Sequence, residues 1–375
     1  MKRPQQNLKV ENTMSTATPP ISGSATTPAP SAGHTRRRWT AFGGSLRELA
    51  LIPVIIVVAI AGTVFVPYFA SVDNVINNIL STSAVLGVMV IAQSIILISG
   101  YFDLSMQSVV GLAPMLAVWL IAPAADGGSG ANLPSWAAPL IVLGLGAAVG
   151  LVNGFLVGKL RLNAFIVTLA MLILLQGFTL GISKGQTFSN LPESMAFIGT
   201  TSPLGIPLDV WILVIVVIVA AVFMRYVPTG RRIYAMGGNE KAAKAAGVRT
   251  LRMTVGLFVF GGVMAGFAGV LLSTRIASVT ANQGENLIFT VFAAAVIGGI
   301  SLDGGKGSII GAATGVLLLG MINNILVLSN VPSFWIDATY GAIILGALLI
   351  GSAEVRNTVL APFQKKSRSQ AMTSS

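Results

Sequence analysis

The chain has 375 residues, of which 54% are apolar and only 9% are charged, whereas a soluble domain carries about 25% charged residues. With a mean hydropathy of +0.83, it has too few polar side chains to cover a surface in water, so we expect a membrane protein. The absence of cysteine and the presence of one histidine exclude disulfides and thiolate metal sites and argue against histidine chemistry. The net charge of +11 first suggests nucleic acid or anionic lipid, but its distribution favours another explanation.

Polar tails flank a long apolar region. Residues 1–44 are rich in Ser, Thr, Pro and Ala and include a run of three arginines. Such a segment cannot bury enough apolar area to offset its ordering entropy, so we expect a disordered, basic, cytoplasmic tail. We expect residues 45–352 to form the membrane domain and residues 353–375 a short cytoplasmic tail.

The membrane domain contains ten apolar stretches of roughly the length that a helix needs to cross about 30 Å of hydrocarbon. Helices are the only open-ended elements that satisfy their own backbone hydrogen bonds in lipid. We therefore predict an all-α polytopic membrane protein with about ten transmembrane helices. The stretches are 49–69, 76–98, 105–123, 135–158, 163–183, 208–226, 253–274, 287–302, 307–327 and 333–351.

The positions of Lys and Arg predict the orientation of these helices. When both termini are placed in the cytoplasm, 21 of the 23 basic residues fall in cytoplasmic tails and loops, and only Lys184 and Arg275 fall outside. Membrane topology therefore accounts for most of the positive charge. We expect no nucleic-acid partner.

The spans contain no recognisable catalytic or nucleotide-binding motif. The glycine-rich segment 299–307 lacks the spacing of a phosphate-binding loop. Ionisable residues inside membranes usually mark ion pathways, but Asp103 and Asp303 are expected in inner connections rather than in mid-membrane. We therefore predict a transport subunit without catalytic residues, metal or other cofactor, which moves a neutral solute and leaves any ATP hydrolysis to another chain.

The most informative segment is the loop 229–252, which follows the sixth predicted helix. Asn239 is suited to cap a short helix that Gly247 would end, and a glycine pair precedes this helix as a turn. The helix would be basic on one side and small on the other, which favours docking of a cytosolic partner over an ordinary positively charged loop. The candidate coupling residues are Gly237, Gly238, Asn239, Glu240, Ala243, Ala246 and Gly247.

This loop resembles the coupling loop of the ribose-type permeases of bacterial ABC sugar importers. The resemblance covers about residues 45–352, and the chain departs from the family pattern Gly-Gly-Ile-Asp-Leu-Ser-Val-Gly at residues 100–107, which read GYFDLSMQ. Further matching blocks are SGYFDLSMQSVVGL (99–112), VNGFLVGKLRLNAFIVTLAMLILLQG (152–177), AGFAGVLLSTRIAS (265–278), AAVIGGISLDGGKGSIIGAATGVLLLGMINNIL (294–326) and PSFW (332–335).

The resemblance implies the partners of the chain. A second permease subunit, either another copy or a paralogue, would complete the membrane part. A soluble extracytoplasmic binding protein would deliver a small neutral sugar, and a cytosolic ATPase would bind the ATP and contact the loop 229–252.

Polar residues within the predicted spans are candidates for the solute path, because neutral sugars need amide and hydroxyl partners. Interhelical hydrogen bonding is the alternative role for each of them. Asp103 is also suited to cap the helix that follows it, and Phe165 either stacks against a sugar or packs against neighbours. The pathway candidates are Gln93, Asp103, Asn153, Phe165, Thr168, Gln176, Asn323 and Asn324.

The leading hypothesis is a multi-pass permease of the bacterial inner membrane that imports a pentose or hexose with a separate ATPase. Two alternatives remain open. A permease of the same fold would import nucleosides or branched-chain amino acids, and a stand-alone facilitator would need no ATPase.

Overall fold

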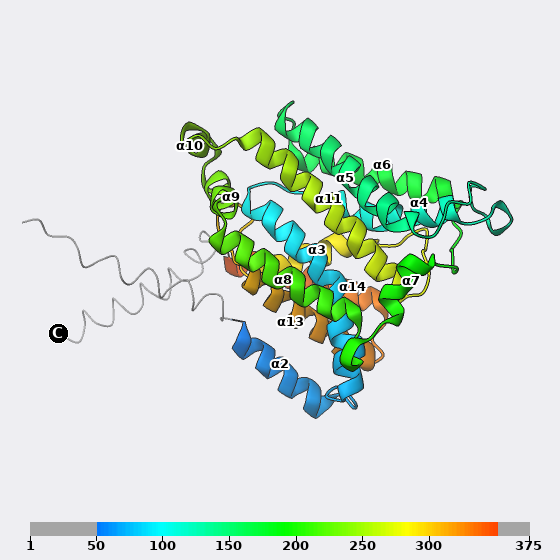
Figure 1. The fold of residues 1–375 in the computed structure, drawn as a ribbon. Coiled ribbons are helices and arrows are strands. Elements are labelled where there is room, and N and C mark those ends of the chain that lie inside the picture. The colour runs from blue at the N-terminus through cyan, green and yellow to red at the C-terminus, as the bar shows by residue number, and fades with distance from the viewer. Residues whose placement is uncertain (1–50, 352–375) are drawn as a thin grey trace, which may run out of the picture. The chain divides into compact units, whose positions relative to one another are not determined.

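The computed structural model describes residues 51–351. The predictions for residues 1–44 and 353–375 lie outside the described residues. The described part is built from helices, and its one feature of β type is an isolated bridge between Phe188 and Val279 (Figure 1).

The helices follow one another with short connections. In chain order they are α2 (Ile52–Phe65), the π-helix η1 (Asn74–Leu80), α3 (Ser81–Ile98), α4 (Met106–Ile121), the 3-10 turn η2 (Ala124–Asp126), α5 (Ala137–Gly158), α6 (Ala164–Ser183), α7 (Glu193–Thr200), the 3-10 turn η3 (Pro203–Gly205), α8 (Leu208–Tyr226), α9 (Pro228–Gly238), α10 (Glu240–Ala245), α11 (Thr250–Arg275), α12 (Leu287–Ile297), α13 (Ile309–Leu328) and α14 (Ser333–Gly351).

Every stretch predicted to span the membrane overlaps one of these helices over most of its length. Six of them are long and apolar enough to cross a bilayer, namely η1 continued by α3, α5, α6, α8, α11 and α13. The helices α2, α4 and α12 are apolar but shorter. The all-α polytopic architecture is therefore confirmed, whereas ten crossings and cytoplasmic termini stay predictions.

Local sequence explains where several helices begin. The side-chain oxygen of Asn163 accepts a hydrogen bond from the backbone N–H of Ile166 at the start of α6, at 3.2 Å. The Ser308 hydroxyl does the same for Gly311 in α13, also at 3.2 Å. These caps satisfy N–H groups that the first helical turn leaves without a partner.

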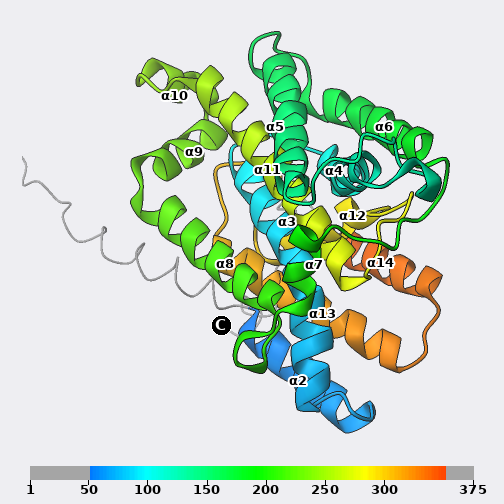
Figure 2. The same ribbon diagram turned by 45° about the vertical axis from the view of Figure 1, so that its right-hand side comes forward.

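The connections gather at two ends of the helix bundle. At one end lie α9 and α10 (Figures 1 and 2), and there the chain after α3 meets the turn between α12 and α13, since Gly305 donates a backbone hydrogen bond to Ile98 at 2.8 Å. At the opposite end, the Ser194 hydroxyl donates to the Ser135 carbonyl at 2.6 Å. We call the first of these the α10 end.

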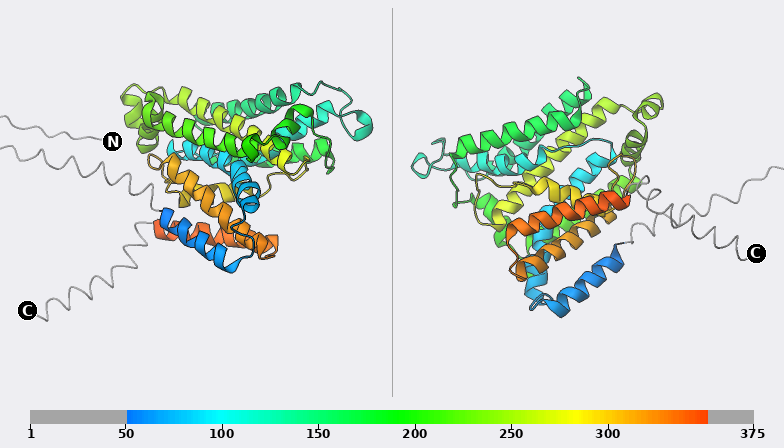
Figure 3. Two further views of the ribbon diagram at one scale, coloured as in Figure 1. Left: turned by 60° about the horizontal axis from the view of Figure 1, so that its bottom comes forward. Right: turned by 180° about the vertical axis from the view of Figure 1, so that it is seen from behind.

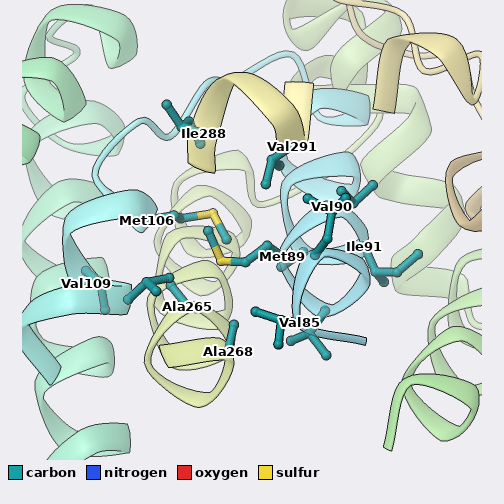
Figure 4. Packing of buried hydrophobic residues seen from close by; sticks show 14 of the residues in the cluster. Val85, Met89, Val90, Ile91, Met106, Val109, Ala265, Ala268, Ile288 and Val291 are labelled. Carbon is teal, nitrogen blue, oxygen red and sulfur yellow. The ribbon is translucent and has the colours of Figure 1, made fainter. Parts of the chain in front are cut away.

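The core lies where α11 packs against α3, α4 and α5. Met89 of α3 and Met106 of α4 are fully buried and point toward each other beside Ala265 and Ala268 of α11 (Figure 4). The helix α2 lies apart from this core, beside α13 (Figure 3), where Phe69 and Met321 belong to a second, smaller apolar cluster.

Glycines allow α5 and α11 to approach backbone to backbone. A Cβ on Gly150 would overlap the carbonyl oxygen of Phe258, and one on Gly262 would overlap that of Gly146. Small residues are the usual means of close helix contact in lipid, because apolar burial gives little drive for association there. The α5–α11 seam is thus a tightly packed part of the bundle.

Candidate functional site

The segment expected to be a coupling loop consists of two helices, α9 and α10, joined at Asn239. The Asn239 side chain accepts a hydrogen bond from the backbone N–H of Ala242 at 3.0 Å, so the predicted cap is confirmed. Gly247 has a left-handed φ of +86° and follows the end of α10, as its predicted role requires. The predicted turn at Gly237 and Gly238 is wrong, because both residues form the last turn of α9.

The short helix α10 presents a basic face to the exterior. Lys241 and Lys244 are exposed, as are Glu240 and Ala246. Ala243 is only 5% exposed and points toward the protein. A partner that docks on α10 would therefore contact the lysine face, and the role of Ala243 is to seat the helix.

Glycines join α9 to the membrane helices at the α10 end. A Cβ on Gly237 would overlap the carbonyl oxygen of Ile98 and stand 2.6 Å from the amide nitrogen of Gly305. Gly304 has a φ of +81°, and a Cβ there would lie 2.8 Å from the Cα of Gly100. We call this meeting of Gly100, Gly237, Gly304 and Gly305 the glycine junction. It connects the end of α9 with the end of α3 and with the turn that precedes α13.

Two tyrosines reinforce this junction, and neither was among the candidate site residues predicted from the sequence. The Tyr234 hydroxyl of α9 donates to the carbonyl of Gly307 at 2.9 Å. The Thr254 hydroxyl donates to the Tyr101 hydroxyl at 3.3 Å. Burial raises the pKa of Tyr101, and the carboxylate of Glu240 acts in the same direction, so this phenol stays neutral at physiological pH.

Two of the pathway candidates come together in a buried polar cluster beside α11. The Asp103 Oδ1 atom accepts from the Ser105 backbone N–H at 3.0 Å and from its hydroxyl at 2.6 Å, directly before α4 begins. The Asn153 side chain of α5 donates to the same Ser105 hydroxyl at 2.8 Å. Asp103, Ser105 and Asn153 are almost completely buried.

Asp103 was expected in an inner connection, and the structure places it deeper. Its Oδ2 atom would lie 3.8 Å from a Cβ on Gly261, which belongs to the middle of α11. The segment 99–105 therefore dips into the bundle. Sequence periodicity missed this, because a residue outside an apolar stretch was assigned to a connection.

Several buried polar atoms of this cluster and of α3 form no hydrogen bond with the described residues. They include Oδ2 of Asp103, Oδ1 of Asn153 and both polar atoms of the Gln93 side chain in α3. A buried polar group without a partner costs about 1–3 kcal/mol, so native proteins keep few of them and usually for a reason. Thr168, by contrast, donates to the Ala164 carbonyl of its own helix at 2.8 Å.

The other pathway candidates lie elsewhere. Asn324 is paired with Asn74 by two side-chain hydrogen bonds of 2.8 and 2.9 Å, as the interhelical alternative requires, and Asn323 is half-buried. Gln176 is also half-buried and lines a cavity of only about 10 Å³. Phe165 is 49% exposed on α6 and is separate from the polar cluster.

The sequence analysis also missed Gln283, in the connection between α11 and α12. Its side-chain amide donates to the carbonyls of Val110 and Gly269 at 3.1 and 3.0 Å. It holds this connection in the bundle at a point where α4 and α11 meet. Apart from Asp103, the polar candidates were taken from inside the apolar stretches, and Gln283 lies outside them.

Comparison with known proteins identifies the family to which the chain belongs. The family model described as branched-chain amino acid transport system / permease component matches residues 75–353. The chain belongs to this family of transport-system permeases. It is a multi-pass membrane protein.

Individual relatives agree over most of the chain. The Ribose import permease protein RbsC of Escherichia coli (strain K12) is 32% identical over 318 residues, which cover 84% of this chain and 96% of that protein. The Haemophilus influenzae protein of the same name is 34% identical over 81% of this chain and 92% of its own length. The L-arabinose transport system permease protein AraH of Escherichia coli (strain K12) is 33% identical over 82% of this chain and 91% of its own length. No solved structure matches significantly.

Proposed function

We propose that the chain is the membrane-spanning permease subunit of an ATP-binding cassette importer for a small neutral sugar, placed in the bacterial inner membrane. The observation that carries this proposal is the near full-length similarity to ribose and arabinose permeases. The family description names branched-chain amino acid transport, which keeps that substrate class as the second candidate. Transport requires no catalytic residue in this chain, because a separate ATPase supplies the energy.

The geometry of α9 and α10 supports coupling to such an ATPase. The exposed lysines of α10 form a docking surface, and α9 reaches the membrane helices through the glycine junction. Backbone contacts without intervening side chains leave little room for independent movement. A displacement of α10 by the ATPase would therefore move the ends of α3 and the turn before α13, which is what alternating access requires.

The buried cluster supports a neutral solute. Buried atoms without a hydrogen-bond partner among the described residues belong to the amides of Gln93 and Asn153 and to the carboxylate of Asp103. Such groups can exchange hydrogen bonds with sugar hydroxyls. The second permease copy or paralogue and the extracytoplasmic sugar-binding protein belong to the same proposal, as partners that the family relationship suggests.

The first test is co-purification of an ATPase with the full chain, using variants chosen from the exposed side of α10. Ala245→Trp adds bulk at an exposed position and is preferred to a change at Ala243, which is buried. Ala131→Trp is the matched control, because Ala131 is exposed in the connection between α4 and α5, at the end of the bundle opposite the α10 end. We expect the native chain and the control to retain the ATPase and Ala245→Trp to lose it.

The second test is uptake by proteoliposomes that contain the chain, the ATPase and the binding protein. We expect ATP-dependent uptake of a pentose or hexose. Uptake of leucine but no sugar would favour the amino-acid alternative, and equal uptake without the ATPase would show a facilitator and overturn the proposal.

A further inference from the structure

A large apolar groove lies between α8 and α11, outside the polar cluster and the glycine junction. Its volume is about 910 Å³, which is at the upper end of the range for ligand sites. The walls are formed by side chains such as Ile215 and Phe223 of α8 and Phe260 and Met264 of α11. Gly256 of α11 faces open space in this groove, since a Cβ there would meet no atom within 4 Å.

One end of the groove is strongly basic. Arg232 of α9, Arg249 before α11 and Arg252 of α11 line it, and all three are exposed. No acidic residue is among the lining residues. Their guanidinium groups form neither a hydrogen bond nor an ion pair with any residue of the described range 51–351. Three such groups at one place repel one another unless an anion joins them.

The length of the groove matches one leaflet of a bilayer. Along α11 its lining runs from Arg252 to Met264, which at 1.5 Å per residue corresponds to about 18 Å. The hydrocarbon core of a bilayer is about 30 Å thick. The arginines therefore stand at the level of the headgroups when the apolar part of the groove reaches to about the midplane.

We propose that this groove binds an anionic phospholipid from the leaflet at the α10 end. The phosphate lies against Arg232, Arg249 and Arg252, which offer the planar pairs of donors that suit phosphate oxygens. The acyl chains lie along α8 and α11. Basic pockets between transmembrane helices are a recognised form of site for anionic headgroups. The bound lipid would link α9 to α11, and the inference does not rest on the proposed sugar transport.

The test is lipid binding to the delipidated, full chain in detergent, measured by native mass spectrometry. Phosphatidylglycerol and phosphatidylcholine with identical acyl chains are added separately. We expect the native chain to retain phosphatidylglycerol in preference to phosphatidylcholine and to show a raised unfolding midpoint with it, because a ligand that binds only the folded state stabilises that state. The preference should weaken as salt is raised.

Two variants test the basic end and the apolar part of the groove separately. Replacing Arg232, Arg249 and Arg252 with Gln should weaken phosphatidylglycerol binding roughly a hundredfold, on the basis of the usual contribution of each basic residue near a membrane surface. Gly256→Phe fills the apolar part and leaves the arginines in place. It should displace the lipid while the unfolding midpoint without lipid stays close to that of the native chain.

Matched controls separate a site from general attraction. Replacing Arg231, Lys241 and Lys244 with Gln removes the same charge from exposed positions outside the groove lining, and Gly177→Phe adds the same bulk to an open position on α6. Both should bind phosphatidylglycerol as the native chain does. Equal binding of the two lipids, or equal losses in the charge variant and its control, would overturn the proposal. Dissociation of a dimer by Gly256→Phe without loss of lipid would assign the groove to a second copy instead.

Discussion

The α5–α11 seam and the exposed face of α6 are both rich in glycine, yet they use it in opposite ways. At the seam, Gly150 and Gly262 bring backbone atoms into direct contact. On α6, a Cβ on Gly177 or on Gly181 would meet no atom within 4 Å. The same residue type therefore closes one helix pair and leaves another helix face open.

This difference divides the bundle into a fixed part and an available part. The buried polar cluster lies against α5 and α11, so its geometry is set by contacts that cannot adjust through side-chain rotation. The open faces of α6 and α8 are left for lipid or for another subunit. Replacement of a glycine by a larger residue should therefore change stability by an amount that depends mainly on where the glycine lies and only weakly on which side chain is added.

The largest effect is expected for Gly150→Leu. Its side chain would overlap the backbone of α11, and overpacking of this kind costs about 1–3 kcal/mol or more. We expect a strongly lowered unfolding midpoint or no monodisperse protein after solubilisation. Gly177→Leu is the matched control on α6 and should change stability by no more than about 0.5 kcal/mol. Similar midpoints for the two variants would show that the seam is not rigid.

The next effect distinguishes neighbouring glycines at the end of α9. A Cβ on Gly237 would overlap the Ile98 carbonyl, whereas one on Gly238 would meet no atom within 4 Å. We expect Gly237→Ala to lower ATP-driven uptake by tenfold or more while the ATPase stays bound, because the glycine junction is forced apart. Gly238→Ala should transport normally. Normal uptake by both variants would exclude the junction as the coupling path.

The end of α9 and the buried polar cluster also show what could be predicted from the sequence. Apolar length located every long helix, because a helix in lipid must satisfy its own backbone, and local capping rules placed Asn239 correctly. Neither rule specifies which glycine faces a neighbouring backbone. Gly237 was therefore expected in a turn, and Asp103 in an inner connection. Long-range packing instead places Gly237 against the backbone of Ile98 and buries the Asp103 side chain.

A smaller effect is expected at the edge of the bundle, where Asn324 of α13 pairs with Asn74 of η1. Asn324→Ala removes both hydrogen bonds, and such bonds between helices in membranes are worth about 0.6–2 kcal/mol. Its neighbour Asn323 is half-buried and makes no side-chain hydrogen bond within the range 51–351. Asn323→Ala should therefore leave the unfolding midpoint unchanged, and an equal loss in both variants would contradict a structural role for the pair.

The smallest effect on stability is expected for Gln93→Leu. The Gln93 side chain is fully buried, and neither its amide nitrogen nor its amide oxygen forms a hydrogen bond with the described residues. An apolar side chain of similar shape removes an unsatisfied amide, so we expect an unfolding midpoint that is unchanged or slightly raised. If the amide binds solute, sugar uptake should fall about tenfold, the equivalent of one lost hydrogen bond of ~1.4 kcal/mol.

Ser94→Ala is the control for this change, because the Ser94 hydroxyl is also buried without a partner. This change also removes a buried polar group that has no partner, and it should leave sugar uptake unchanged. A stable Gln93→Leu variant with reduced uptake would show that the packed part of the bundle retains an unpaired amide for the solute. Undiminished uptake would remove Gln93 from the path and favour Asp103 and Asn153, two further side chains with a buried polar atom that has no partner among the described residues.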